Sequence, residues 1–88
     1  MPLQSRKHKR TEQMRVNPAG DWSIADVQAV CDASGVTLLP PSGGSHYKVT
    51  HDSQAEILTI PARRPIKAIY IKKLIRFIDQ VLVHANKT

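Results

Sequence analysis

The chain has 88 residues, of which 41% are hydrophobic and 23% are charged, and this length suffices for one domain with a modest core. Thirteen Lys and Arg residues against seven Asp and Glu residues give a formal net charge of +6. No apolar run is long enough to cross a bilayer, and no apolar segment follows the charged N-terminus as in a secretion signal, so we expect a cytoplasmic protein without a membrane partner. The single cysteine, Cys31, excludes an intrachain disulfide framework and fits a reducing compartment.

The positive charge is concentrated toward the two ends of the chain. Residues 1–22 hold five Lys and Arg against two acidic residues, residues 23–47 hold none against two, and residues 48–88 hold eight against three. This asymmetry favours a polyanionic partner, because each phosphate that a Lys or Arg neutralises releases counterions. A basic surface without a specific partner explains the composition equally well.

Residues 1–22 form a basic segment in front of a domain at residues 23–88. A short helix is predicted over residues 5–16 with Ser5 as its N-cap, although few of its residues are apolar. The sequence NPAG at residues 17–20 is typical of a helix break. We therefore expect either a basic N-terminal arm or a short helix before the domain.

The first helix of the domain is predicted to run from Ser23, its N-cap, to about Ala33. Asp26 at the third helical position completes a capping-box arrangement with Ser23, and Gly35 supplies the left-handed residue that commonly ends a helix. Four apolar residues recur at helical spacing and predict a buried face: Ile24, Val27, Val30 and Cys31.

Three short strands are predicted next, each bounded by turn-forming residues. Residues 36–39 are β-branched or apolar and are followed by two prolines, which cannot both continue a ladder. Residues 45–51 and 56–60 flank a short turn at residues 52–54, and Pro61 closes the third strand. The second and third strands are therefore expected to form a hairpin.

The second strand carries His46 near its start, and Gly43, Gly44 and Ser45 precede this histidine. These glycines allow the backbone to turn sharply, or a bulky partner to approach it closely. Side chains alternate along the strand, so His46, Lys48 and Thr50 share one face and Tyr47, Val49 and His51 share the other. Thr59 of the third strand falls on the side of His46.

A basic connector at residues 62–66 leads into a final amphipathic helix predicted from Lys67 to about Ala85. Its apolar stripe consists of Ile71, Leu74, Ile75, Ile78, Val81 and Leu82. The cations on the opposite side, which we interpret mainly as solvent-facing, are Lys72, Lys73 and Arg76. The predicted fold is α+β in the order α-β-β-β-α, with two helices on one face of a three-stranded antiparallel sheet and His46 on the open face.

Residues 23–82 resemble the HicA family of bacterial toxins. The motifs that carry this resemblance are the Gly44-Ser45-His46 opening of the second strand, the Leu58-Thr59-Ile60-Pro61 end of the third, and the basic connector into a helix. HicA proteins are small ribonucleases with a double-stranded-RNA-binding-domain-like fold, made beside a HicB antitoxin. The resemblance implies a metal-independent mRNA interferase that is paired with a HicB-like antitoxin and uses His46 as its catalytic residue. The segment at residues 1–22 is longer than in the short members of the family.

The chemistry of RNA cleavage agrees with this histidine. Attack of a 2′-hydroxyl on the adjacent phosphate needs a general base, a general acid and positive charge near the phosphorane, and imidazole serves as either acid or base near neutral pH. Around His46, the residues that we expect to bind RNA are Gly44, Ser45, Lys48, Arg63, Arg64 and Lys67. The sequence indicates no second acid or base: His51 points to the other face at a turn, and His8 and His84 belong to the terminal segments.

Cofactors and alternative functions follow from the same residues. No His, Cys, Asp and Glu residues are spaced as a metal-ligand set, so we expect neither a metal nor a small-molecule cofactor. The alternatives are a catalytically silent RNA-binding module of the same fold and a protein that acts mainly through its antitoxin partner. His46 in those cases is a surface residue that caps a loop, and the connector is simply solvated.

Overall fold

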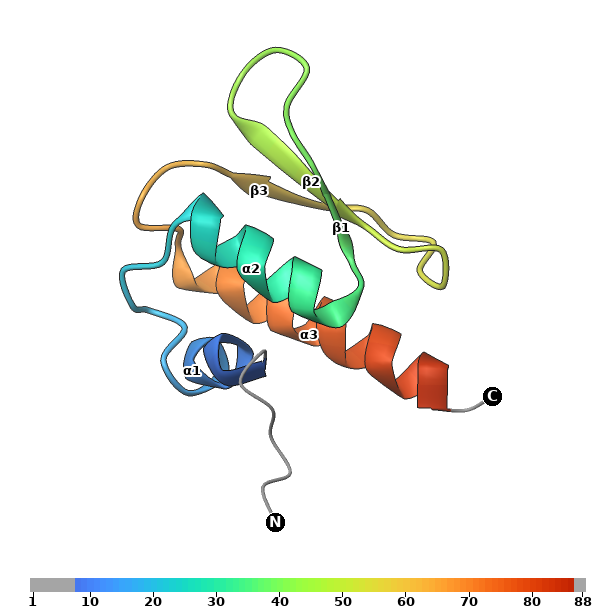
Figure 1. Cartoon of the computed structure of the whole chain (residues 1–88). Coiled ribbons are helices and arrows are strands. Elements are labelled where there is room, and N and C mark those ends of the chain that lie inside the picture. Colours follow the sequence, from blue (N-terminus) through green and yellow to red (C-terminus); the bar gives the residue numbers. More distant parts are fainter. Residues whose placement is uncertain (1–7, 87–88) are drawn as a thin grey trace.

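The computed structural model describes residues 8–86 and shows two layers, a sheet and a layer of helices (Figure 1). The elements are α1 Lys9–Val16, α2 Ile24–Ser34, β1 Thr37–Leu39, β2 His46–Thr50, β3 Leu58–Pro61 and α3 Ala68–Asn86. The strands form one antiparallel sheet in the order β1-β2-β3, and α2 and α3 cover one of its faces. The prediction of an α+β chain with a three-stranded antiparallel sheet is confirmed, and the order from α2 to α3 agrees with the α-β-β-β-α layout.

The ends of α2 are fixed by the residues that the sequence predicts for them. The Ser23 hydroxyl accepts a hydrogen bond from the Asp26 N–H at 3.4 Å, and the Asp26 carboxylate accepts one from the Ser23 N–H at 2.9 Å. Gly35 adopts φ 71°, in the left-handed region where a side chain is disfavoured, and ends the helix. The capping box and the C-terminal glycine are therefore both confirmed.

The covered face of the sheet is centred on Val49 of β2, which is fully buried. Val49 pairs with Leu38 of β1 on one side and with Leu58 of β3 on the other. Tyr47 and Ile60 pair with each other two residues further along, and both contact the core. These apolar side chains meet the helices because the side chains of a strand alternate between its two faces.

The helix α3 supplies the largest part of the opposite side of the core. Five residues of its predicted stripe are buried: Ile71, Leu74, Ile75, Ile78 and Val81. The prediction for Leu82 is wrong, because this side chain is 37% exposed. Phe77, which the predicted stripe omits, is only 6% exposed. The buried side of α3 is therefore wider than its sequence spacing indicates, because α3 contacts α1, α2 and β3.

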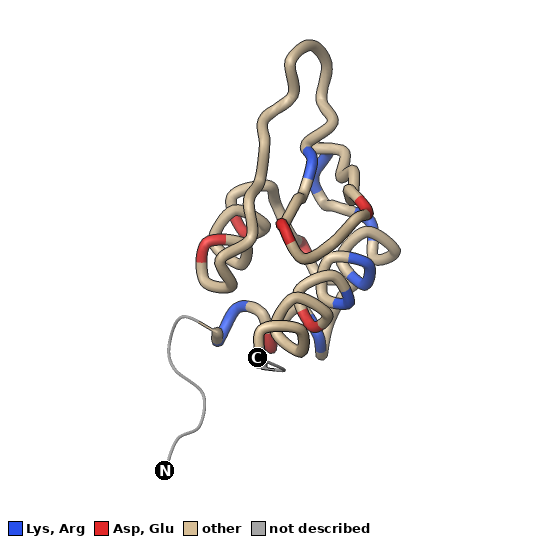
Figure 2. Tube along the Cα trace, turned by 90° about the vertical axis from the view of Figure 1, so that its right-hand side faces the viewer, with Lys and Arg blue, Asp and Glu red and all other residues tan. Residues whose placement is uncertain are grey.

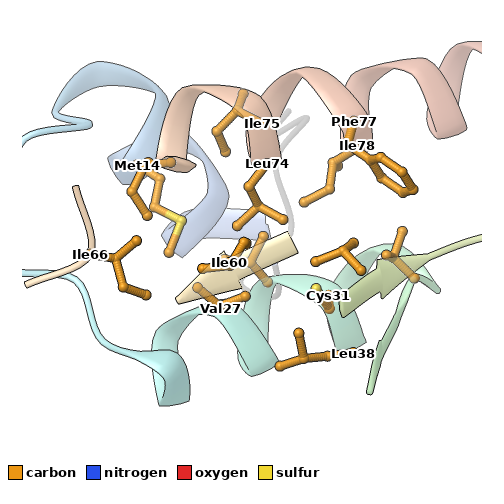
Figure 3. Packing of buried hydrophobic residues seen from close by; sticks show 14 of the residues in the cluster. Met14, Val27, Cys31, Leu38, Ile60, Ile66, Leu74, Ile75, Phe77 and Ile78 are labelled. Atoms are coloured by element: carbon orange, nitrogen blue, oxygen red, sulfur yellow. The ribbon is translucent and has the colours of Figure 1, made fainter. Parts of the chain in front are cut away.

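The described part of the N-terminal segment is a helix that packs on the domain. The predicted N-cap Ser5 lies outside the described residues. Met14 of α1 is fully buried and points into the core near Ile66 and Leu74 (Figure 3). Arg15 donates to both carboxylate oxygens of Asp79 in α3 at 2.7 and 2.8 Å, and these hydrogen bonds are the main reason why the pKa of Arg15 is raised. Of the two forms predicted for residues 1–22, the short helix is therefore found at Lys9–Val16, and the predicted residues 5–7 of that helix lie outside the described range.

We expect Met14→Ala to lower the free energy of unfolding by about 2–5 kcal/mol, because it removes a buried side chain and leaves a cavity beside α3. Val16→Ala is the matched control on the same helix, since Val16 is 83% exposed and its loss should change stability little. Urea unfolding of the full chain measures both. Equal, small losses for the two variants would mean that α1 contributes no packing energy to the domain.

Candidate functional site

The open face of the sheet carries His46 and Lys48, which are both exposed. The register places Lys48 at the centre of this face, between Leu39 of β1 and Thr59 of β3, while His46 lies opposite Pro61. All five of these residues lie on the face that the helices leave uncovered. The predicted alternation along β2 is confirmed, and it puts an imidazole and an ammonium group on the same solvent-facing surface.

A projecting loop joins β1 to β2 and ends at His46 (Figure 1). Gly44 has φ 115°, a conformation that side chains rarely adopt, and no atom outside its immediate chain neighbours lies near the position of a Cβ at Gly43 or Gly44. Ser45 is exposed. The backbone before His46 is therefore accessible to a large ligand, as the glycine pair predicts.

The connector between β3 and α3 begins beside this loop. The Ala62 N–H donates to the Ser45 carbonyl at 2.9 Å, so the ladder of β2 and β3 continues one residue beyond His46. At its other end, the Ile66 N–H donates to the Trp22 carbonyl at 2.9 Å. The connector is thus tied to the loop at one end and to the residues before α2 at the other, and the segment between them contains Arg63 and Arg64.

Arg64 forms a bidentate ion pair with Asp21. Its Nε and Nη2 atoms donate to the two carboxylate oxygens at 3.0 and 3.1 Å. The hydrogen bond to Arg64 is the main reason why the pKa of Asp21 is lowered, and the same contact raises the pKa of Arg64. The Arg64 and Asp21 side chains are 64% and 67% exposed, and water screens such pairs strongly, so another anion can compete for the guanidinium. The sequence does not indicate Asp21 as a partner, because it lies 43 residues from Arg64 and nothing local marks the pairing.

The other predicted cations have no such partner. Within residues 8–86, no ion pair is formed by Lys48, Arg63 or Lys67, and all three are exposed. Lys67 directly precedes α3, and its carbonyl accepts hydrogen bonds from the N–H groups of Tyr70 and Ile71. The structure therefore offers three unpaired positive charges on the open face and the connector.

The remaining histidines do not join His46. His51 is half-buried at the turn after β2, where its Nδ1 atom accepts from the Ser53 N–H at 3.0 Å and lies 2.8 Å from the Ser53 hydroxyl. These contacts give His51 a role in holding the turn. His84 is exposed in the last turn of α3, and His8 is the N-cap residue of α1. In the part of the chain that the structure describes, His46 is the one imidazole on the open face of the sheet.

This arrangement can support proton transfer next to a bound phosphate. An exposed imidazole can accept a proton from a hydroxyl and return it to a leaving oxygen, and a lysine on the same face can stabilise the negative charge that develops between these steps. Between residues 8 and 86, no group of three His, Cys, Asp or Glu side chains is placed to hold a metal ion.

Comparison of the chain with protein-family models, with curated proteins and with solved structures gives no match. No helix in the described range has the length and apolar character needed to cross a membrane. The open face of the sheet, the projecting loop and the connector are therefore the features that indicate a function.

We expect Arg64→Gln to raise the pKa of Asp21 toward the ordinary aspartate value, because the variant loses the charged partner of the carboxylate. Since the folded chain holds this pKa low, the pair stabilises the fold at neutral pH, and this contribution disappears as the pH falls through the lowered pKa. An NMR titration of the side-chain carboxyl carbon of Asp21 measures the shift. Lys67→Gln is the control and should leave the titration unchanged; an unchanged Asp21 titration in Arg64→Gln would contradict the pairing in solution.

Proposed function

We propose that this chain is an endoribonuclease that cleaves mRNA. In this proposal it is the toxin of a toxin–antitoxin pair similar to those of the HicA family, and its fold is of the double-stranded-RNA-binding-domain type. One observation supports this proposal most directly. His46 and Lys48 share the open face of the sheet, and the bond between Ser45 and Ala62 brings the basic connector beside the loop that precedes His46. An RNA strand laid across this surface would meet an imidazole, an accessible backbone and unpaired cations together.

The proposed reaction is transfer of the phosphate to the neighbouring 2′-hydroxyl. His46 takes the proton from the 2′-hydroxyl as its oxygen bonds to phosphorus, and the protonated imidazole then gives that proton to the departing 5′-oxygen as the P–O5′ bond breaks. Lys48 stabilises the negative charge of the phosphorane between these steps. The products are a 2′,3′-cyclic phosphate and a 5′-hydroxyl, and the reaction needs no metal ion.

The same surface indicates how RNA would be held. Tyr47, the aromatic residue of β2, packs toward the covered face and the core, so it offers no stacking platform to bases on the open face. Binding would then rest on phosphate and ribose contacts from Gly44, Ser45, Lys48 and the connector, which read the shape of RNA more than its sequence. This favours recognition of the RNA backbone around His46.

The proposed partner is a HicB-like antitoxin that covers His46. An inhibitor with an acidic surface would approach the unpaired cations of the open face and the connector faster at low salt, because opposite charges steer association. Since mRNA is the proposed substrate, we also propose that the protein acts in the cytoplasm. Neither a metal nor a small-molecule cofactor takes part in this proposal.

We expect His46→Ala to reduce cleavage of a long RNA by at least about 100-fold, because it removes the group that moves the proton. The thermal unfolding of the variant should match that of the unmodified chain, since His46 is exposed and contributes little packing. Cleavage is followed in buffer with EDTA, with analysis of the product ends for the 2′,3′-cyclic phosphate. His84→Ala, which removes an exposed histidine far along the chain, is the control and should cleave normally.

Three outcomes of this experiment would count against the proposal. Full activity of His46→Ala would remove its catalytic role, and activity that is lost in EDTA and restored by Mg²⁺ would replace the mechanism with a metal-dependent one. An unmodified chain that binds RNA but never cleaves it would favour the silent RNA-binding module.

We expect the triple variant Arg63→Ala, Arg64→Ala and Lys67→Ala to bind RNA more weakly whatever its sequence, because these residues are proposed to contact phosphates. For single-stranded RNA, the slope of log affinity against log salt should become shallower by about 2, since three fewer phosphates are neutralised. Titrations of labelled RNA at several salt concentrations measure this slope. Lys72→Ala with Arg76→Ala is the control and should change it less; an unchanged slope in the triple variant would assign the connector to solvent.

A further inference from the structure

A groove of about 560 Å³ runs between β3 and α3. β3 is an edge strand, because the sheet order is β1-β2-β3, so the groove follows the edge that has no neighbouring strand. The residues that line it are Glu56, Ile57, Leu58, Thr59, Lys73, Arg76, Phe77 and Gln80. The volume lies in the range of about 300–1,000 Å³ that is usual for ligand pockets. His46, Gly44 and Ser45 do not line the groove, so it is distinct from the proposed RNA site.

One wall of the groove is the free backbone of β3. The Ala62 N–H donates to the carbonyl of Ser45, the residue before β2. Backbone groups alternate in direction along an antiparallel strand, so the N–H and C=O groups of Ile60 and Leu58 also point toward β2. The N–H and C=O groups of Thr59 consequently point away from β2, toward the groove, and the same alternation continued by one residue before β3 puts those of Ile57 on that side. Among the backbone hydrogen bonds that the described residues form outside the helices and the strand ladders, none involves Ile57 or Thr59. An edge of this kind can pair with an added strand.

The other wall is a basic side of α3. Lys73 and Arg76 are exposed and form no ion pair with any residue between 8 and 86. In Figure 2, several basic positions follow one another along α3, whereas the charged positions of α2 are acidic. Glu56 is the one carboxylate among the lining residues. Phe77 and Leu58 add apolar surface, and Ile57 leaves 59% of its side chain exposed. The groove therefore combines unpaired backbone groups, apolar contact and excess positive charge.

We propose that this groove docks an extended acidic segment of a partner protein, which adds to β3 as a fourth strand. Pairing with Ile57 and Thr59 requires donors and acceptors at the spacing of a β-strand, which a peptide backbone supplies and a sugar–phosphate backbone does not. Every second side chain of the added strand faces α3, where carboxylates meet Lys73 and Arg76. Pro61 has no N–H and ends the edge, so the paired stretch is short.

The test uses the full chain and a capped pentapeptide of alternating glutamate and valine. In ¹⁵N-resolved NMR titrations, we expect saturable shifts of the Ile57 and Thr59 amides. The variant Lys73→Glu with Arg76→Glu should bind at least about tenfold more weakly, as expected when close opposite charges become like charges. His46→Ala should bind the peptide as well as the unmodified chain does, which separates this site from the proposed ribonuclease site.

Two N-methylated peptides test the strand pairing without changing the protein. Methylation of one alternating set of peptide amides should abolish binding, because those N–H groups face β3, and methylation of the other set should leave it intact. Equal binding of both methylated peptides would overturn the proposal, as would the absence of a saturable shift at millimolar peptide. An oligouridylate of the same charge as the peptide is the last comparison. If it binds as tightly as the peptide and shifts the signals of Ile57, Thr59 and Lys73, the proposal is overturned and the groove is a nucleic-acid surface.

Discussion

The packing of α3 across the covered face of the sheet is the contact on which the rest of the structure depends. Leu74 and Ile78 of α3 are fully buried in the same cluster as Val49 of the central strand β2 and Ile60 of the edge strand β3. Met14 of α1 joins this cluster from the N-terminal segment (Figure 3). Short strands gain stability by packing an apolar face against helices, and α3 provides this contact. Because the helices pack on one face of the sheet, the other face is free for polar side chains.

The position of His46 follows from the register of β2. Val49 must face the helices, so His46 and Lys48 must face solvent, and a slip of one residue would reverse both. The same register fixes the distance along the ladder between the loop before His46 and the connector after Pro61. The candidate site is therefore held in place by a buried valine as much as by any residue in the site itself.

The ion pairs of the chain divide its positive charges into two groups. Among the described residues, Arg10, Arg15 and Arg64 are paired with carboxylates, and these pairs join α1 to α2, α1 to α3, and the connector to the residue before Trp22. The basic residues of the open face and of α3 lack such partners. Arg10 and Arg15 hold α1 against α2 and α3, whereas the unpaired residues remain available to an anionic partner. The Arg64 pair is largely exposed, so an anion can compete for that guanidinium as well.

Sequence by itself determined the elements whose causes are local. The capping box of α2, the left-handed Gly35, the alternation that exposes His46 and most of the α3 stripe all follow from residues a few positions apart, and all agree with the structure. Only the tertiary structure decided that Arg64 binds Asp21, 43 residues away, and that the ion pair of Arg15 and Asp79, 64 residues apart, joins α1 to α3. It also decided that α3 and the free edge of β3 enclose a groove. Capping and periodicity are set by neighbours along the chain, whereas these contacts exist only after the helices have packed on the sheet and brought distant segments together.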